Sequence, residues 1–256
     1  MRRFVIGDIH GCAKALDTLI ETIHPTSTDE IVFLGDYIDR GPNSRDVVKQ
    51  VIELGKSCRT VTLRGNHEIM MLGVALYGLD DKVWLANGGN ATLSSYGGKL
   101  SKVPDLHIEF FRGLRPYYEI DESIFVHAGY DPALEMRHQE ETTLYWMHLP
   151  NPLPEPHISG KRVFVGHTPQ PSGMVMSAEH LVGIDTYCFG GGYLTAYDVT
   201  TCESIQANRH GHLRKAPFRK LFEGVQFAAK TAGGVCRKLV SGKQPDSTKP
   251  VTESAD

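Results

Sequence analysis

Near its start the chain reads Phe4-Val5-Ile6-Gly7-Asp8-Ile9-His10-Gly11, a short apolar run followed at once by an acidic residue and a histidine. The same plan recurs at residues 31–41 (IVFLGDYIDRG) and at residues 60–68 (TVTLRGNHE). The apolar runs are rich in β-branched and aromatic residues, which favours buried strands. Residue types that bind metals therefore follow the ends of predicted strands, where open α/β sheets place their ligands.

Helical spacing of apolar residues lies between these stretches. It covers residues 13–23 and 44–54, with Ser44 as a cap of the second helix, and a third helix is expected to continue from Glu68. Strands that alternate with helices in this way predict βαβ units. Residues 78–116 interrupt the pattern with turn-rich sequence, and we expect a mainly helical segment there, beside the polar clusters.

The second half of the chain, from residue 117 onward, is predicted to contain strands only. A hairpin is expected over residues 117–126, and further strands over residues 162–165, 181–184, 193–199 and 204–207. Two of these strands end beside a glycine and a histidine, in the tripeptides His127-Ala128-Gly129 and Gly166-His167-Thr168. They repeat the plan of the first three stretches.

Bulk properties exclude several classes of protein. The chain has 256 residues, of which 41% are hydrophobic and 22% charged, as in ordinary globular domains. No apolar run approaches the roughly 18 residues that span a bilayer, and the amino terminus lacks the apolar core of a secretion signal. The five cysteines are odd in number and widely spaced. This pattern predicts reduced thiols and a cytoplasmic protein.

Charge is distributed unevenly along the chain. Residues 1–208 contain 17 basic and 26 acidic residues, whereas residues 209–243 contain nine basic residues and one acidic residue. We therefore predict a catalytic domain over residues 1–208 and a basic C-terminal extension over residues 209–256, with a disordered end. The basic stretch 209–243 is a candidate for weak contact with an acidic surface, while no nucleic-acid partner is expected.

The polar residues after the predicted strands suit one kind of chemistry. Two divalent metal ions held close together can clamp phosphate oxygens and lower the pKa of a water molecule, which makes phosphoester hydrolysis feasible. Carboxylate, imidazole and amide groups are the ligands that such ions accept. The candidate metal ligands are Asp8, His10, Asp36, Asn66, His127 and His167.

These motifs resemble those of the phosphoprotein phosphatase family of metallophosphoesterases, nearest to its small bacterial and phage members of the lambda phage type. The motifs are GDIHG, GDYIDRG, RGNHE, HAG and GHT, and the resemblance covers roughly residues 1–200. It implies a four-layer α/β/β/α sandwich with two mixed sheets. The sequence by itself indicates only an α/β class, with βαβ units followed by strands.

The resemblance also implies a role for each motif residue. Asp8 and His10 would hold the first metal ion, Asp36 would bridge the two ions, and the second ion would lie on the ligands Asn66, His127 and His167. The ions would be divalent, with Mn²⁺ favoured and Fe or Zn as alternatives, since all accept this ligand set.

Three further residues have implied catalytic or substrate-binding roles. His67 would protonate the leaving oxygen and Asp39 would orient it, while Arg40, together with Asn66, would bind the phosphate. A carboxylate next to an imidazole keeps the imidazole charged and aimed, and a guanidinium matches phosphate oxygens with a planar fork. The implied reaction is direct attack by a metal-bridging hydroxide, without a covalent phosphoenzyme.

The expected function is that of a monomeric metal-dependent phosphomonoester hydrolase, specifically a serine/threonine protein phosphatase acting on a phosphoprotein or phosphopeptide. One alternative is a symmetrical diadenosine tetraphosphate hydrolase. Enzymes of that type typically read GNHD and lack the aspartate of the DRG triplet, so Glu68 and Asp39 favour the phosphatase. Another alternative is a metal-binding pseudophosphatase scaffold, which the retained ligands, Asp39 and His67 disfavour.

The chain departs from the family pattern at two positions. Many relatives carry a second phosphate-binding arginine after a tryptophan, where this chain has His148. Either His148 takes that place, or Arg137 or Arg162 substitutes for the arginine. Relatives also tend to carry glycine where this chain has Tyr187, a residue that we expect to pack rather than to narrow the cleft.

Overall fold

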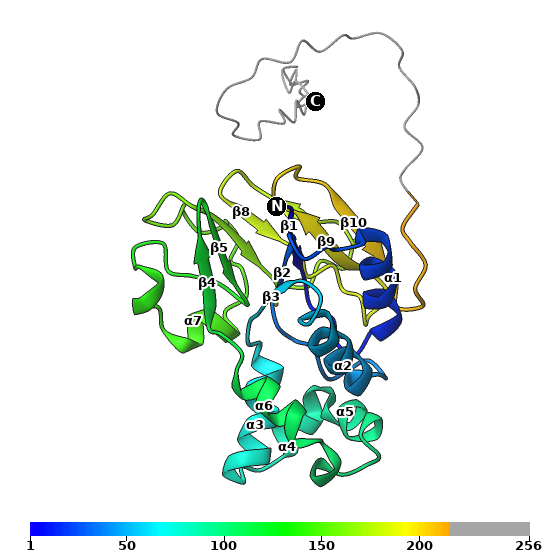
Figure 1. Cartoon of the computed structure of the whole chain (residues 1–256). Helices are drawn as coiled ribbons and strands as arrows, with labels where there is room; N and C mark the ends of the chain where they lie inside the picture. The colour runs from blue at the N-terminus through cyan, green and yellow to red at the C-terminus, as the bar shows by residue number, and fades with distance from the viewer. Residues whose placement is uncertain (216–256) are drawn as a thin grey trace, which may run out of the picture. The chain divides into compact units, whose positions relative to one another are not determined.

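The computed structural model describes residues 1–215. Within them the chain forms two five-stranded mixed sheets, with strand orders β10-β9-β1-β2-β3 and β4-β5-β6-β8-β7 (Figure 1). The strands are β1 Arg3–Ile6, β2 Glu30–Phe33, β3 Arg59–Thr62, β4 Tyr117–Ile120, β5 Ser123–Val126, β6 Arg162–Val165, β7 Met176–Ser177, β8 Leu181–Gly183, β9 Leu194–Asp198 and β10 Ser204–Ala207.

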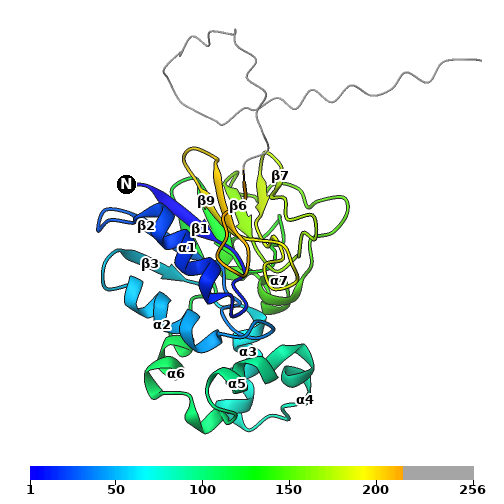
Figure 2. The same ribbon diagram turned by 90° about the vertical axis from the view of Figure 1, so that its right-hand side faces the viewer.

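Helices connect and cover these strands. Their bounds are α1 Ala13–Ile23, α2 Ser44–Leu54, α3 Asn66–Tyr77, α4 Lys82–Trp84, α5 Asn90–Ser95, α6 Asp105–Arg112 and α7 Glu141–Trp146, with a π-helical turn η1 Leu85–Gly89 and 3₁₀ turns η2 Leu100–Lys102 and η3 Met136–His138. Helices α3 to α6 gather below the sheets in both views (Figures 1 and 2). This confirms the helical segment predicted over residues 78–116.

Alternation along the strands produces the layers. In β1, Phe4 and Ile6 face a core formed with α1 and α2, whereas Val5 belongs to a core that joins the two sheets. In the second sheet, Phe125 of β5 faces the first sheet, and its neighbour Ile124 packs in an outer cluster with residues of α7. The predicted sandwich of two mixed sheets with outer helices is confirmed.

Strand direction determines where the site lies. Strands β1, β2 and β3 are parallel to one another, so their carboxyl ends meet at one edge of the first sheet. Strands β5, β6 and β8 are likewise parallel in the second sheet. Strands β9 and β4 are antiparallel to their neighbours β1 and β5. The loops that leave the parallel strands carry the predicted metal ligands.

The structure corrects three local predictions. The half predicted to contain strands only includes the helix α7, which is too short for its helical period to be recognised. Asn43 rather than Ser44 occupies the N-cap of α2, and Ser44 is the first helical residue. The third strand is only partly buried, because β3 is the edge of its sheet.

Residues 209–215 continue from β10 with hydrogen-bonded turns, in which Asn208 N–H donates to the carbonyl of His212. Most of the predicted basic extension 209–256, including the end predicted to be disordered, lies outside the described residues, so its boundary and its surface contact stay predictions. No helix in residues 1–215 is long and apolar enough to cross a membrane.

Candidate dinuclear metal centre

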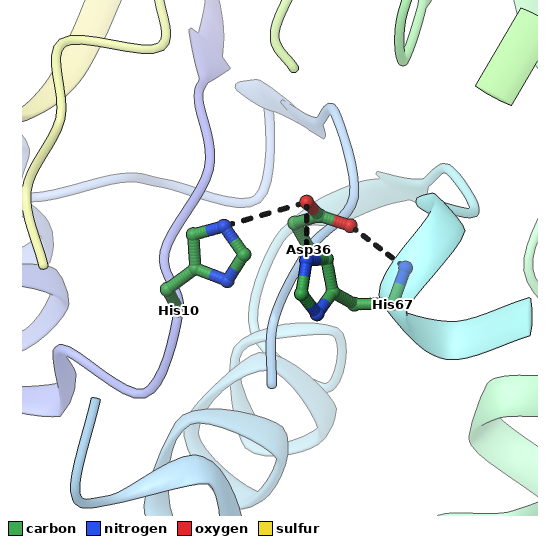
Figure 3. Close-up of side chains that lie close together, drawn as sticks. All are labelled: His10, Asp36 and His67. Atoms are coloured by element: carbon green, nitrogen blue, oxygen red, sulfur yellow. Dashed lines mark hydrogen bonds and ion pairs between the residues drawn. The ribbon is translucent and has the colours of Figure 1, made fainter. Parts of the chain in front are cut away.

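The predicted site residues leave the carboxyl ends of five strands and meet at one edge of the two sheets. The loops after β1, β2 and β3 supply Asp8, His10, Asp36, Asn66 and His67, and the loops after β5 and β6 supply His127 and His167. Asp36 lies between His10 and His67 in the close-up (Figure 3). Apart from His167, which is half-buried, these seven side chains are almost completely buried.

The backbone at these loops adopts a conformation that residues other than glycine rarely take. His10, Asp36 and His167 have φ of 45°, 52° and 55°, and Asp39 and Arg40 have φ of 71° and 66°. Left-handed φ values cost energy and collect at functional sites, where the surrounding fold holds them. Five predicted site residues therefore share a strained backbone that presents their side chains at the sheet edge.

One cluster of potential metal-binding atoms centres on Asp36 Oδ2. His10 Nε2 lies 3.4 Å from this oxygen, and His67 Nε2 lies 3.9 Å from it (Figure 3). His10 Nδ1 lies 2.8 Å from the carbonyl oxygen of Ile38. A nitrogen facing a carbonyl carries the proton, so the lone pair of His10 is on Nε2 and faces the carboxylate.

A second cluster surrounds the other oxygen of the same carboxylate. His127 Nε2 lies 3.5 Å from Asp36 Oδ1, 3.1 Å from Asn66 Oδ1 and 3.2 Å from His167 Nδ1. The opposite ring nitrogens face carbonyls, with His127 Nδ1 at 2.9 Å from Leu34 O and His167 Nε2 at 3.2 Å from Trp146 O. Four acceptor atoms therefore converge.

Converging lone pairs repel one another unless a cation lies among them. The convergence of these four acceptor atoms therefore suits a metal ion. Burial lowers the pKa of His127 and His167, so both rings are neutral and available as ligands. Carboxylate, amide and neutral imidazole are the donors that borderline divalent ions accept. The residues fit a dinuclear centre bridged by Asp36, and the ligand set leaves the identity of the metal open.

Asp8 stands beside these clusters rather than inside them. Its carboxylate accepts the backbone N–H of His167 at 3.0 Å, and it belongs to neither compact group of ligand atoms in the described part of the chain. Burial, followed by the charges of Asp185 and Asp36, raises its pKa well above the ordinary value. A nearby cation stabilises a buried carboxylate that faces other carboxylates. The role of Asp8 as a metal ligand stays a prediction, and this stabilisation is the physical argument for it.

His67 and Asp39, the predicted proton donor and its partner, form a buried pair. His67 Nδ1 donates to Asp39 Oδ2 at 2.6 Å, and both side chains are almost completely excluded from solvent. Burial opposes the charged ring, but the charges of Asp36 and Asp39 outweigh it and raise the pKa of His67. His67 Nε2 has no hydrogen-bond partner in residues 1–215. Asp39 therefore engages Nδ1 of the ring, while Nε2 faces the Asp36 carboxylate without a hydrogen bond.

Arg40 reaches the same edge. Its Nη1 lies 3.0 Å from His10 Nε2, and its guanidinium stands over the ring of Phe189 at 4.6 Å from the ring centre. Cation–π contact with an aromatic face holds a guanidinium in place while its remaining N–H groups stay available. Arg40 is exposed, as a group that meets a phosphate needs to be.

Glu68 connects the second and third loops. Its carboxylate accepts three backbone N–H groups, from Asp36 at 3.0 Å, Tyr37 at 2.9 Å and Gly65 at 2.9 Å. The bond to Gly65 closes a capping box at the start of α3. Glu68 thereby fixes the strained turn at Asp36 relative to the helix that carries Asn66 and His67.

The two departures from the family pattern have defined surroundings. The ring of His148 stacks on the predicted ligand His167, with centroids 4.7 Å apart. Arg162 stands at the opposite end of β6 from His167, and Arg137 pairs with Glu135 on the surface. Only His148 of these three candidates contacts the site, although phosphate binding by it stays a prediction. The ring of Tyr187 contacts the ring of Phe189, with centroids 4.8 Å apart, and the expectation that Tyr187 packs rather than narrows the cleft stays a prediction.

Sequence reasoning missed three residues of the site. Trp84 and Thr92 both donate hydrogen bonds to Asp39, and Asp185 is a buried carboxylate next to Asp8. Trp84 and Thr92 lie in turn-rich sequence that carries no motif, and Asp185 stands outside the five motifs, two residues before Tyr187. The position of Asp185 directly after β8, at a strand's carboxyl end, was the one available signal.

Residues 1–200 match the family described as calcineurin-like phosphoesterase. The chain is 28% identical over 225 residues to the bis(5'-nucleosyl)-tetraphosphatase PrpE [asymmetrical] of Oceanobacillus iheyensis, a match that covers 77% of this chain and 88% of that protein. It is 32% identical over 142 residues to the symmetrical bis(5'-nucleosyl)-tetraphosphatase of Buchnera aphidicola, covering 54% of this chain and 47% of the relative.

A crystal structure described as a putative diadenosine tetraphosphatase has the same fold. It superimposes with a TM-score of 0.63 at 21% identity and covers 80% of this chain and 92% of that one. The chain thus spans most of the asymmetrical enzyme but only about half the length of the symmetrical one.

Proposed function

The chain belongs to the calcineurin-like phosphoesterase family and is a metal-dependent phosphoesterase, and we propose that its substrates are dinucleoside tetraphosphates. The observation that carries the chemistry is the buried Asp39–His67 pair beside two clusters of lone pairs that share Asp36. The observation that supports the substrate is the match along 88% of a relative named as a bis(5'-nucleosyl)-tetraphosphatase.

We infer that six side chains would hold two divalent ions, namely Asp8, His10, Asp36, Asn66, His127 and His167. When bound, the ions would neutralise phosphate charge and make a water molecule acidic enough to attack phosphorus. Arg40, with Asn66 beside it, would bind a phosphate oxygen through its planar fork. His67 would hold its proton at Nε2 for the departing oxygen, and Asp39 would keep the ring aimed.

A second candidate is the hydrolysis of phosphoserine or phosphothreonine in a protein. The observation that favours it is again the Asp39–His67 pair, since an alkoxide is a poor leaving group that needs a proton, whereas a nucleoside polyphosphate leaves readily without one. Glu68 and Asp39 were expected to disfavour a tetraphosphatase, yet proteins with that name are among the relatives. The dependence of the rate on the leaving group therefore distinguishes the two candidate functions.

A substrate panel tests both candidates. Purified protein with Mn²⁺ would be given diadenosine tetraphosphate, phosphoserine and phosphothreonine peptides, mononucleotides and p-nitrophenyl phosphate. We expect the highest kcat/KM for the tetraphosphate, and its products identify the cleavage, because ADP alone indicates symmetrical hydrolysis and ATP with AMP indicates asymmetrical hydrolysis. A higher kcat/KM for the phosphopeptides would overturn the tetraphosphate proposal in favour of the phosphatase.

The His67→Asn variant measures what the proton donor contributes. We expect kcat to fall about 10²–10⁴-fold on a phosphoserine peptide, the usual range for loss of a general acid, and clearly less on diadenosine tetraphosphate. Bound metal, measured by elemental analysis, should stay unchanged if His67 is not a ligand. Loss of metal in this variant would instead assign His67 to the cluster that it forms with His10 and Asp36.

A further inference from the structure

The helical segment from Trp84 to Thr92 lies directly against Asp39 and Arg40. It contains the end of α4, the π-helical turn η1 and the start of α5. Trp84 and Thr92 are 2% and 0% exposed, and Asp39 is likewise fully buried. This segment therefore contacts the predicted catalytic pair, and its turn-rich sequence does not reveal that contact.

The contact consists of hydrogen bonds to the carboxylate itself. Thr92 Oγ1 donates to Asp39 Oδ1 at 2.6 Å, and Trp84 Nε1 lies 3.1 Å and 3.0 Å from the two carboxylate oxygens. His67 Nδ1 occupies the remaining direction on Oδ2. Three donors from three different side chains thus fix both the position and the rotation of one buried carboxylate.

The backbone of the same segment fixes the next residue. Gly88 has a φ of 104°, and its carbonyl accepts the N–H of Arg40 at 3.2 Å. A Cβ on Gly88 would lie 2.7 Å from Arg40 N, and one on Gly89 would lie 2.7 Å from the Trp84 ring. The two glycines are needed for this close approach, which brings the indole N–H within reach of Asp39.

The polar contacts go beyond what packing requires. A buried aromatic residue can fill the space of Trp84 without an N–H, and valine has the shape of threonine without the hydroxyl. Burial raises the pKa of Asp39, and the hydrogen bonds from His67, Thr92 and Trp84 oppose that rise. His67 opposes the rise in pKa most strongly, and Thr92 and Trp84 add the two hydrogen bonds that fix how the carboxylate is turned toward His67.

We propose that Trp84 and Thr92 are positioning residues that hold the Asp39 carboxylate on His67, so that delivery of a proton to the leaving oxygen depends on this helical segment. The proposal rests on the role given to His67 in the proposed function. Among the described residues neither side chain hydrogen-bonds a predicted metal ligand, and both reach the site through Asp39.

The test uses Trp84→Phe and Thr92→Val. Trp84→Phe removes one donor to the carboxylate, and Thr92→Val removes a second donor together with an acceptor of the Asp39 backbone N–H, at 2.8 Å. Hydrolysis of p-nitrophenyl phosphate, with a good leaving group, is compared with that of phenyl phosphate, with a poor one. We expect kcat on phenyl phosphate to fall about 10–100-fold, the range found when supporting hydrogen bonds are removed, with KM unchanged and p-nitrophenyl phosphate much less affected. Thr92→Ser, which restores the hydroxyl, should recover the rate.

Tyr96→Phe is the matched control. Tyr96 is the C-cap of α5, four residues beyond Thr92; it is buried, and its hydroxyl bonds His107 Nδ1 at 2.7 Å. Removing this hydroxyl deletes a buried polar contact next to the helical segment without touching Asp39. We expect both substrates to be hydrolysed with unchanged relative rates. An equal loss on both substrates in Trp84→Phe and Thr92→Val, like that from any destabilised fold, would overturn the proposal.

A spectroscopic measurement separates this proposal from the role of His67. The Nδ1 proton of His67 in its 2.6 Å bond to Asp39 should give a far-downfield proton resonance in the full-length protein, identified by its loss in His67→Asn. Trp84→Phe and Thr92→Val should shift or broaden it, and Tyr96→Phe should not. If His67→Asn leaves the dependence on the leaving group unchanged, the proposed proton donor fails. An unshifted resonance in both variants refutes the positioning role.

Discussion

The two ends of the strands in the first sheet use charge in opposite ways. At the amino ends of β1, β2 and β3, the residues Arg3, Glu30 and Arg59 stand side by side in register. The fully buried Glu30 carboxylate bonds the guanidinium of Arg3, the guanidinium of Arg59 at 2.8 Å and the hydroxyl of Tyr118 at 3.1 Å. Each charge there is matched within the chain.

At the carboxyl ends of the same strands the balance is different. Asp8, Asp36 and Asp185 are buried near one another, and the neighbouring rings of His10 and His127 are neutral because burial lowers their pKa. The backbone is strained at His10 and Asp36, in the loops that leave β1 and β2. The amino ends therefore stabilise the sheet, whereas the carboxyl ends give up stability to keep charge available for ligands.

The largest expected effect on stability comes from removing the charge at the centre of the amino-end network. In Glu30→Ala, the buried side chain of Arg3 loses its buried partner, since its other partner, Asp121, is exposed. Breaking a buried ion pair from one side costs about 3–5 kcal/mol. Urea unfolding should report this loss in the free energy of unfolding, while kcat per folded molecule stays as in the parent.

Glu30→Gln is the milder companion, because it retains an acceptor for one guanidinium while removing the charge. It should lose less stability than Glu30→Ala. If either variant lowers kcat at a temperature where the protein is fully folded, the amino ends contribute to the site, and the distinction between the two strand ends is wrong.

At the carboxyl ends we expect the opposite sign. Burial, with a contribution from Asp36, raises the pKa of Asp185 to about 6, and Asp185 Oδ2 has no hydrogen-bond partner among residues 1–215. Asp185→Asn should therefore stabilise the EDTA-treated protein at pH 7 by about 2–3 kcal/mol, the equivalent of a shift of about two units. Saturating Mn²⁺ should reduce the advantage, since a bound cation compensates the carboxylate.

The sign follows from where the proton is held. A carboxyl whose folded-state pKa is raised binds its proton more tightly in the folded chain, so the metal-free parent loses stability as pH rises from about 4 to about 6. The difference between Asp185→Asn and the parent should consequently be small at pH 4 and constant above pH 7. A variant less stable than the parent at pH 7 would show that Asp185 is compensated, which contradicts the contrast between the ends.

The sequence predicts the gathering of the candidate ligands at one sheet edge, because few physical rules determine it. Parallel strands end at a common edge, so residues that follow apolar runs, such as Asp36 and His127, must come together whatever the loops do in between. The same rule applies to His167 after β6. The sandwich follows from the alternation of strands and helices, with the family resemblance supplying its layers.

The other parts of the site depend on contacts that leave no periodic signal in the sequence. Trp84 and Thr92 reach Asp39 through a turn-rich segment whose path is set by Gly88 and Gly89, and no pattern in that segment reveals its partner. Asp8 lies beside the two lone-pair clusters because its carboxylate bonds the backbone of His167, a contact between the two sheets. The motifs carry no information on such long-range contacts, so the choice between a phosphoprotein and a dinucleoside tetraphosphate stays a prediction.

The smallest expected effect on stability comes from an ion pair at the amino ends that is partly exposed to solvent. Asp29 precedes β2 and bonds Arg2 Nη2 at 2.7 Å, and this bond, outweighing burial, lowers the pKa of Asp29. Because Arg2 is 45% exposed, solvent screens the pair, so Asp29→Asn should cost only about 1 kcal/mol at pH 7. A lowered pKa contributes stability at a pH above the pKa of the unfolded chain, near 4, and this stability is lost as the pH falls below that value. The free energies of unfolding of Asp29→Asn and the parent should therefore converge in acid.

Asp80→Asn, which removes an exposed pair with Lys82, should change the free energy of unfolding less still. A cost for Asp29→Asn as large as that for Glu30→Ala would mean that burial of the carboxylate, rather than matching of the charges, sets the stability of these strand ends.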